Sequence, residues 1–302
     1  MADIVLAALN SRYSHTAFGL RYLLANMEEL QPRTAMLEYE IKTPLDQVIE
    51  GIAAHSPRIV GLSVYIWNAN LALTLVKRLR KELPGVKIVL GGPEVSHEVE
   101  KQEICALADF VVMNEGDFVF PILCRQLLAG ETPPQRVING GSVDVRKLKL
   151  PYYLYTDEDI AHRVIYVEAS RGCPFDCEFC LFSLNIPVRR FPLESILPAF
   201  QELLDRGVRH FKFMDRTFNL SIKYGIDILS FFLERYTPGL FLHFEMVPDR
   251  LPEELKDILS CFPKGSMQLE VGIQTFNEEV AERIKRRQDY AITAEKYSLA
   301  AQ

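Results

Sequence analysis

Three cysteines in the middle of the chain have a spacing that suits a metal centre. Cys173, Cys177 and Cys180, with three and then two residues between them, follow the apolar stretch at residues 164–169. One tight loop could therefore direct three thiolates to a common centre. Thiolates bind soft metals, and a cubic iron–sulfur cluster normally takes four of them. Three local ligands without an obvious fourth predict a [4Fe-4S] cluster whose remaining iron is open to another molecule.

Two structural alternatives compete with this cluster. Structural zinc prefers four ligands, commonly in paired Cys/Cys or Cys/His spacings, and the nearby His162 could in principle complete such a set. The other alternative is that the three cysteines are simply buried. Charged residues stand between them, at Asp176 and Glu178, which disfavours plain burial. The iron–sulfur interpretation is therefore preferred.

The elements that must position these residues form two α/β halves. The first half alternates short apolar runs with amphipathic helical patterns, which is typical of βα units. Strands are expected at residues 4–9, 34–39, 59–65, 87–90 and 110–113. Five such units predict a doubly wound, flavodoxin-like parallel sheet over residues 1–135, with any ligand at the carboxyl ends of the strands. Pro133-Pro134, Gly140-Gly141 and Pro151 break the alternation over residues 131–163, and residues 136–163 are interpreted as a linker.

The alternation resumes in a second domain at residues 164–302. Strands are expected at residues 164–168, 210–214, 240–245 and 267–273, and helices near 193–206, 222–235, 252–262 and from 278. Repeated βα units of this kind predict a partial (β/α) barrel of about four strands. The polar, helix-prone tail at residues 285–302 is an unusual place for a parallel sheet to end. A truncated barrel is therefore expected.

Composition narrows the class of protein further. The 34 basic and 40 acidic residues leave a net charge of −6 without a Lys/Arg block, which disfavours nucleic acid or an anionic membrane as a partner. No apolar run approaches the ~20 residues of a membrane span. Six cysteines are too few and too clustered for a secreted disulfide scaffold, so a cytoplasmic location is expected. The three outside the loop, Cys105, Cys124 and Cys261, are expected to be buried.

The cysteine loop resembles that of the radical S-adenosylmethionine (radical SAM) enzymes. The resemblance rests on the spacing, on the position after the first strand of a βα series, and on Phe179 just before the last cysteine. It implies that the open iron binds S-adenosylmethionine. It further implies that an electron from the reduced cluster cleaves this cofactor to a 5′-deoxyadenosyl radical, in a site that excludes water.

The same resemblance implies cofactor contacts elsewhere in the barrel. Asp215, with Arg216 beside it, lies at the end of the second barrel strand, where the family binds the cofactor's amino group. The alternative is that Asp215 and Asn219 cap the next helix. Glu270 and Gln274 are expected on one face of the fourth strand and resemble ribose-contacting and other polar site positions. A glutamate inside a barrel strand needs a partner or a ligand.

An N-terminal α/β domain fused to such a barrel resembles the cobalamin-binding subgroup of the family. The implied corrin contacts lie at or after strand ends: Tyr65, Gly91, Gly92, Pro93, Glu115 and Gly116. Glycine at these places lets backbone approach a ligand closely, although tight turns use the same residues. The Asp-x-His-x-x-Gly signature, whose histidine ligates cobalt, is absent. His15 stands in the corresponding loop, where capping or packing is the favoured role.

The leading hypothesis is a cobalamin-dependent radical SAM enzyme that transfers a methyl group to an unactivated carbon. One alternative is a non-catalytic module that binds or senses cobalamin and the cluster, and another is a radical SAM enzyme that catalyses cyclisation or oxidation without methyl transfer. A methylthiotransferase is disfavoured, because its first domain should carry its own cluster cysteines and this one has only Cys105 and Cys124. The partners expected are a small-molecule or peptide substrate and an external electron donor of flavodoxin or ferredoxin type.

Overall fold

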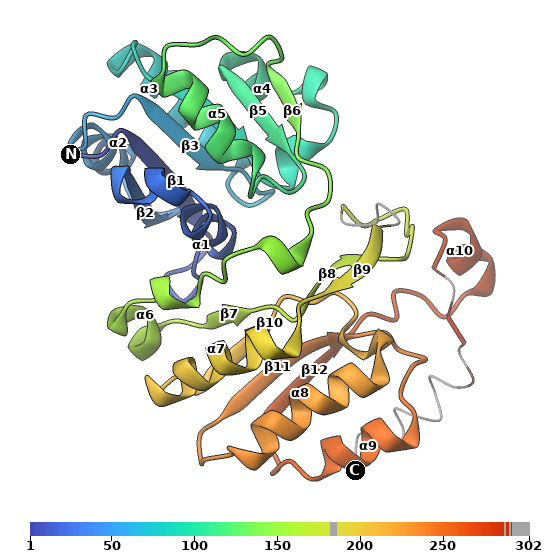
Figure 1. The fold of residues 1–302 in the computed structure, drawn as a ribbon. Helices are drawn as coiled ribbons and strands as arrows, with labels where there is room; N and C mark the ends of the chain where they lie inside the picture. The colour runs from blue at the N-terminus through green and yellow to red at the C-terminus, as the bar shows by residue number, and fades with distance from the viewer. Residues whose placement is uncertain (182–185, 287, 290, 292–302) are drawn as a thin grey trace. The chain divides into compact units, whose positions relative to one another are not determined.

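The structure is a computed structural model that describes residues 1–181, 186–286, 288–289 and 291 (Figure 1). The chain divides into two compact units, Met1–Arg163 and Val164–Gln302. Within the described part of the chain, no helix is both long enough and apolar enough to cross a membrane. Most of the tail predicted at residues 285–302 lies outside the described residues.

The first unit is built on one six-stranded sheet in which every neighbouring pair is parallel. Its strands are β1 (Ile4–Asn10), β2 (Thr34–Glu40), β3 (Ile59–Ser63), β4 (Lys87–Gly91), β5 (Phe110–Met113) and β6 (Val137–Asn139). Its helices are α1 (Phe18–Ala25), α2 (Leu45–Ala53), α3 (Ala69–Glu82), α4 (Glu103–Leu107), α5 (Val119–Leu128) and α6 (Asp157–His162). The sheet order β2-β1-β3-β4-β5-β6 reverses at β1, since β2 adds to one side of it and β3 to the other. The predicted doubly wound fold is therefore confirmed.

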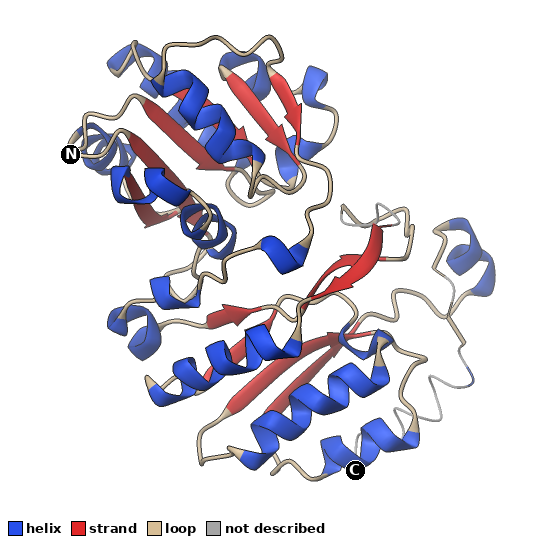
Figure 2. Cartoon of the chain, viewed as in Figure 1, coloured by secondary structure: helices blue, strands red, loops and turns tan. Residues whose placement is uncertain are grey.

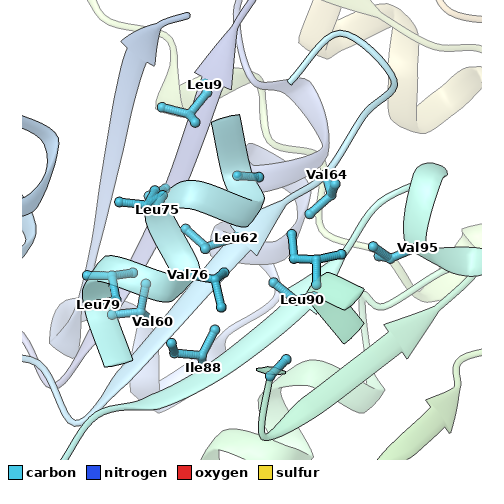
Figure 3. Close-up of a cluster of buried hydrophobic side chains, with 14 of the residues drawn as sticks. Leu9, Val60, Leu62, Val64, Leu75, Val76, Leu79, Ile88, Leu90 and Val95 are labelled. Carbon is cyan, nitrogen blue, oxygen red and sulfur yellow. The ribbon is translucent and has the colours of Figure 1, made fainter. Parts of the chain in front are cut away.

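The core of the first unit lies on both faces of this sheet. Successive side chains of a strand point to opposite faces, so Val5 belongs to a buried cluster with Leu75 of α3, whereas Leu6 belongs to a second cluster with Leu20 of α1. Figure 3 shows the first of these clusters, in which Val60 and other strand residues meet α3. Burial on both faces explains why these strands read as nearly continuous apolar runs.

The sheet of the first unit has one strand more than the sequence predicts. β6 pairs in parallel with β5 through Val111 and Val137, and it comes from the segment 136–163 that was interpreted as a linker. The same segment supplies α6, whose Asp159 accepts a hydrogen bond from the buried Arg21 of α1 at 2.8 Å. A three-residue strand between proline and glycine pairs has too short a pattern to be recognised from sequence.

The second unit contains a four-stranded parallel sheet in the order β12-β11-β10-β7. Its strands are β7 (Ile165–Val167), β10 (His210–Phe213), β11 (Phe241–Met246) and β12 (Met267–Val271). Its helices are α7 (Leu193–Asp205), α8 (Ile222–Glu234), α9 (Glu253–Ser260) and α10 (Glu278–Arg283). Each strand adds to the same side of the one before it, as in a (β/α) barrel, so the predicted partial barrel of four strands is confirmed.

One face of this second sheet is aromatic and packs on helices. Phe213 of β10 lies with its ring centroid 5.7 Å from that of Phe200 on α7 and 4.5 Å from that of Phe244 on β11. Phe211 contacts Phe232 of α8 at 5.0 Å. Because side chains alternate along a strand, the residues between these phenylalanines point to the opposite face, where the polar side chains described below lie.

A separate antiparallel hairpin interrupts the barrel between β7 and α7 (Figure 2). It consists of β8 (Ser170–Cys173) and β9 (Ile186–Arg190), with Cys173 opposite Ile186. Cys177 and Cys180 lie in the connection between the two strands. The hairpin was not predicted, because β9 contains Pro187, a residue that sequence reasoning excludes from central strands but that an edge strand tolerates.

Candidate metal centre and cofactor sites

The cysteine loop begins at the end of β8 and turns back through Cys177. Cys173 and Cys180 are partly exposed, Cys177 is buried, and the Cys180 N–H donates to the Cys177 carbonyl at 3.1 Å. Across the described residues, no group of three ligating side chains is gathered closely enough to hold a single metal ion. Structural zinc takes four ligands around one ion, whereas each thiolate of a cubic cluster binds a different iron.

A backbone N–H and an arginine lie close to the thiols. Burial raises the pKa of the Cys173 thiol, while a hydrogen bond from the Phe175 N–H and the positive charge of Arg286 act in the opposite direction. Arg286 Nη1 lies 3.8 Å from Cys177 Sγ, and its Nη2 donates to the Gly272 carbonyl just after β12. Arg286 was not predicted as a site residue, because it stands in a polar tail without periodicity.

The cysteines outside the loop divide into two groups. Cys105 and Cys124 are buried, as expected, and burial raises the pKa of both thiols. The prediction that Cys261 is buried is wrong. Cys261 caps the C-terminal end of α9 and is exposed, with its Sγ donating to the Asp257 carbonyl at 3.3 Å. Its apolar neighbour Phe262, which follows the end of the helix, is the buried residue here.

Asp215 lies beyond the end of β10 and turns inward. Its Oδ2 accepts the Ala169 N–H at 2.8 Å and its Oδ1 accepts the Ser170 hydroxyl at 2.5 Å, so both oxygens serve the residues at the start of the cysteine hairpin. The residue is 2% exposed. Burial raises the pKa of its carboxyl to about 7. The described contacts do not include capping of α8 by Asp215, whereas Asn219 binds the Val247 backbone through both N–H and C=O.

Arg216 and Glu270, the two predicted barrel residues, take part in ion pairs on the polar face of the sheet. Arg216 Nη1 lies 3.0 Å from Glu245 Oε1. Glu270 Oε2 lies 3.1 Å from His243 Nε2 and 4.0 Å from Lys212 Nζ. The predicted requirement for a partner is thus met by protein side chains. Both partners of Glu270 could have been predicted from the sequence. Each is a polar residue between two buried apolar residues of a strand, and side chains alternate between the two faces of a strand.

Gln274 is not on the face of β12 that the sequence predicts. The strand ends at Val271, and Gln274 follows in a left-handed conformation with φ of 71°. A Cβ atom added to Gly272 would lie 2.7 Å from Gln274 Nε2, so the amide of Gln274 folds back over Gly272. The alternation with Glu270 fails because the chain leaves the extended conformation before it reaches Gln274.

Glu168 and Arg171 flank the root of the hairpin. Arg171 Nε lies 2.9 Å from Glu168 Oε1, and the side chains are 14% and 8% exposed. This nearly buried ion pair links the residue that lies two positions before β8 to the second residue of that strand.

The predicted cobalamin residues gather at one edge of the first sheet. Tyr65, the Gly91–Pro93 turn and the Glu115–Gly116 turn follow β3, β4 and β5, which are adjacent strands. The switch point of the sheet, between β1 and β3, lies at the same edge, and such points are where ligands of doubly wound sheets bind. Tyr65 stacks on Trp67 with ring centroids 4.4 Å apart, and Trp67 is 49% exposed.

The glycines at this edge also have structural reasons to be glycine. Gly92 has φ of 107°, and a Cβ there would collide with the Val64 backbone. A Cβ on Gly116 would lie 3.1 Å from a methyl of Val112. Glu115 accepts the Val143 N–H at 2.7 Å, which fastens the segment after β6. These residues therefore shape the edge of the sheet itself.

Two histidines complete the set of sequence candidates. His15 lies in a turn after β1, where its N–H donates to the Arg12 carbonyl at 3.1 Å and its carbonyl accepts from Asn10. His162 ends α6 and is exposed, with its Nε2 3.7 Å from Glu158 Oε2. These contacts of His15 are made by its backbone groups, which help to order the loop.

Comparison with protein families matches both units of the chain. The family model described as B12 binding domain matches residues 4–123. The model described as radical SAM superfamily matches residues 167–301, which include the cysteine loop.

Comparison with individual proteins gives relatives that are named as methyltransferases. An uncharacterized methyltransferase of Pyrococcus horikoshii is 26% identical over 294 residues, which cover 88% of this chain and 57% of that protein. The cobalamin-dependent radical SAM methyltransferase TokK of Streptomyces tokunonensis is 26% identical over 168 residues, 45% of this chain and 23% of that protein. The chain thus spans little more than half of the first relative.

A solved structure supports the fold over nearly the whole chain. The radical S-adenosylmethionine methyltransferase TsrM from Kitasatospora setae, solved with a tryptophan substrate and a SAM analog, superposes with a TM-score of 0.75 at 16% identity. The match covers 97% of this chain and 64% of that one. It confirms the predicted order of a flavodoxin-like sheet followed by a partial barrel.

Proposed function

Because this chain belongs to the radical S-adenosylmethionine proteins that carry an N-terminal cobalamin-binding domain, we propose that it serves in methyl transfer to an unactivated carbon. The single observation that carries the proposal is the trio Cys173, Cys177 and Cys180 on a hairpin at the carboxyl end of a parallel barrel sheet. When bound, the cluster would supply an electron for cleavage of S-adenosylmethionine, and cobalamin would carry the methyl group.

In this proposal the three thiolates hold three irons and leave one iron for S-adenosylmethionine. Arg286, next to Cys177 Sγ and on the Gly272 carbonyl, keeps positive charge beside the thiolates and ties the loop to the end of β12. Positive charge near a thiolate favours its deprotonated, metal-binding form.

The polar face of the second sheet is the proposed binding surface for S-adenosylmethionine. This cofactor carries an ammonium, a carboxylate and ribose hydroxyls. Glu270, whose side chain is 56% exposed, is an acceptor suited to hydroxyl groups, and Arg216, 33% exposed, is a donor suited to a carboxylate. Gln274 adds a neutral amide near Gly272. Arg216 and Glu270 keep their protein partners and are still partly exposed.

The carboxyl edge of the first sheet is the proposed cobalamin site. Tyr65 and Trp67 offer a stacked aromatic surface, and the turns at Gly91–Pro93 and Glu115–Gly116 offer backbone groups at the ends of adjacent strands. A flat macrocycle can pack on aromatic rings while its amide side chains bond to backbone. An external one-electron donor of flavodoxin or ferredoxin type and a small-molecule or peptide substrate complete the proposed reaction.

Anaerobic reconstitution of the chain with iron and sulfide tests the proposal. We expect one [4Fe-4S] cluster per chain and, after reduction in the presence of S-adenosylmethionine, release of 5′-deoxyadenosine or a methylated product. The variant Cys177→Ser should lose the cluster, whereas the matched control Cys261→Ser, which changes an exposed cysteine outside the loop, should keep it. Bound zinc in place of iron and sulfide would refute the metal assignment.

A second measurement addresses the first unit. We expect hydroxocobalamin to co-elute with the chain in anaerobic gel filtration. Retention of both cofactors without any cleavage of S-adenosylmethionine would favour the alternative of a non-catalytic binding module.

A further inference from the structure

Asp215 connects the barrel sheet to the start of the cysteine hairpin. We propose that Asp215 is a positioning residue that fixes the root of the cluster loop and does not itself contact S-adenosylmethionine. The inference deepens the proposed function, because it rests on the loop holding an iron–sulfur cluster.

The geometry of the carboxylate carries this assignment. One oxygen accepts the backbone N–H of Ala169 at 2.8 Å and the other accepts the hydroxyl of Ser170 at 2.5 Å. Ser170 is the first residue of β8, and Cys173 is the last. The bonds therefore act on the strand that carries the first thiolate.

The other end of the hairpin is held at the same point. The Tyr224 hydroxyl, from α8, lies 2.9 Å from the Ala169 carbonyl and 2.7 Å from the carbonyl of Phe191, which follows β9. The Phe191 N–H donates to the Ala169 carbonyl at 2.9 Å. Asp215 and Tyr224 thus fasten both ends of the hairpin to β10 and α8, two rigid elements of the barrel.

The same contacts disfavour a direct role in cofactor binding. Asp215 is 2% exposed, and each of its oxygens already accepts a short hydrogen bond. Because the residue is so deeply buried, a ligand ammonium group could reach an oxygen of Asp215 only by moving Ala169 or Ser170 away. Removing either would leave a buried donor unsatisfied, which costs about 1–3 kcal/mol.

The charged groups around Asp215 do not neutralise it. The nearby carboxylate of Glu168 repels its charge, Arg171 is occupied with Glu168, and Tyr224 adds a phenol whose own pKa is raised by burial and by Asp215. Burial is the largest influence and favours the protonated carboxyl, raising its pKa to about 7, whereas the hydrogen bonds from Ala169 and Ser170 favour the ionised form. A buried carboxylate held in this way points to a specific structural task.

The experiment compares variants of the whole 302-residue chain after anaerobic reconstitution. Asp215→Ala removes both hydrogen bonds. Asp215→Asn keeps them in neutral form, because its oxygen can accept from Ala169 and its NH₂ can donate to the rotated Ser170 hydroxyl. Asp205→Asn, at an exposed position bonded only to Gln201 in the described contacts, is the matched control.

The readouts are iron retained under a chelator and the electron paramagnetic resonance spectrum of the reduced cluster with and without added S-adenosylmethionine. We expect Asp215→Ala to hold iron on the order of 10-fold less well, as for other partners outside the ligand set. Asp215→Asn and Asp205→Asn should stay close to the wild type.

Two outcomes would overturn the inference. If folded Asp215→Ala kept its cluster but its spectrum no longer responded to S-adenosylmethionine, Asp215 would be a cofactor ligand. If both the cluster and the response were unchanged, it would have neither role. A wild-type chain without a cluster would instead refute the proposed function.

A second variant keeps the test decisive if circular dichroism shows that Asp215→Ala does not fold. Ser170→Ala removes one of the two hydrogen bonds and leaves Asp215 in place. It should retain iron less well than Asp215→Asn, and equal retention by both would contradict the proposal.

Discussion

Replacement of Asp215 by asparagine should change how the stability of the second unit depends on pH. Burial raises the pKa of this carboxyl from 3.8 to about 7. Between these values the unfolded chain has lost its proton while the folded chain still holds it. Stability from this group is therefore fully present below the unfolded pKa and is lost as the pH rises through the folded one.

The magnitude follows from the size of the pKa change. A difference of about 3 units, at 1.36 kcal/mol each, corresponds to roughly 4 kcal/mol over the whole titration. Between pH 5 and pH 7 this slope lowers the free energy of unfolding of the wild type by about 2 kcal/mol, because the folded carboxyl is itself half ionised at pH 7. The asparagine variant has no proton to lose, so its curve should lack this component.

Thermal unfolding at several pH values measures the effect. Other groups with shifted pKa values, such as His210 and His243, are present in both chains and cancel in the difference. The unfolding midpoint of Asp215→Asn should rise relative to the wild type by on the order of 5–10 °C between pH 5 and pH 7. Asp205→Asn should give a difference that does not vary in this range. A constant difference for Asp215→Asn as well would refute the argument that Asp215 is buried with a raised pKa.

Two further predictions concern glycines in the proposed sites. Gly172→Ala should weaken iron retention and lower the free energy of unfolding, because Gly172 has φ of 100° and its added Cβ would lie 2.6 Å from the Pro187 carbonyl. The control is Gly207→Ala, at φ of 96° with open space around it. It should lower the free energy of unfolding by only about 1 kcal/mol and leave the cluster intact. Gly92→Ala should weaken the retention of hydroxocobalamin in gel filtration, because its Cβ would push against the Val64 backbone and reshape the carboxyl edge of the first sheet. Unchanged retention would show that this edge does not form the cobalamin site.

The elements that the sequence predicts well are those with a strong pattern. The strands at residues 4–9, 110–113 and 240–245 were expected within one residue of the observed β1, β5 and β11. Each is an apolar run bounded by polar or turn residues, and burial decides its conformation. The cysteine spacing likewise predicted the family, since few chemistries need three thiolates in eight residues.

What the sequence could not show depends on the direction of side chains after a strand ends. Asp215 and Gln274 both follow barrel strands, and the sequence predicts cofactor contacts for both, with helix capping as the alternative for Asp215. The structure turns Asp215 inward to Ala169 and folds Gln274 over Gly272. Strand periodicity no longer applies beyond the last extended residue, and the direction is then set by turns and tertiary hydrogen bonds.

One face of the second sheet carries charged side chains in place of the apolar ones that would stabilise a packed barrel interior. On β10 and β11 the phenylalanines that face the helices alternate with Lys212, His243 and Glu245 on the other side. A closed barrel with no ligand fills its interior with branched apolar side chains. Charged side chains cannot be packed that way without a large desolvation cost, even when they are paired. The face must therefore meet water or a polar ligand, which supports the proposal that S-adenosylmethionine binds there. Arg286 joins the adjacent end of β12 to the cysteine loop.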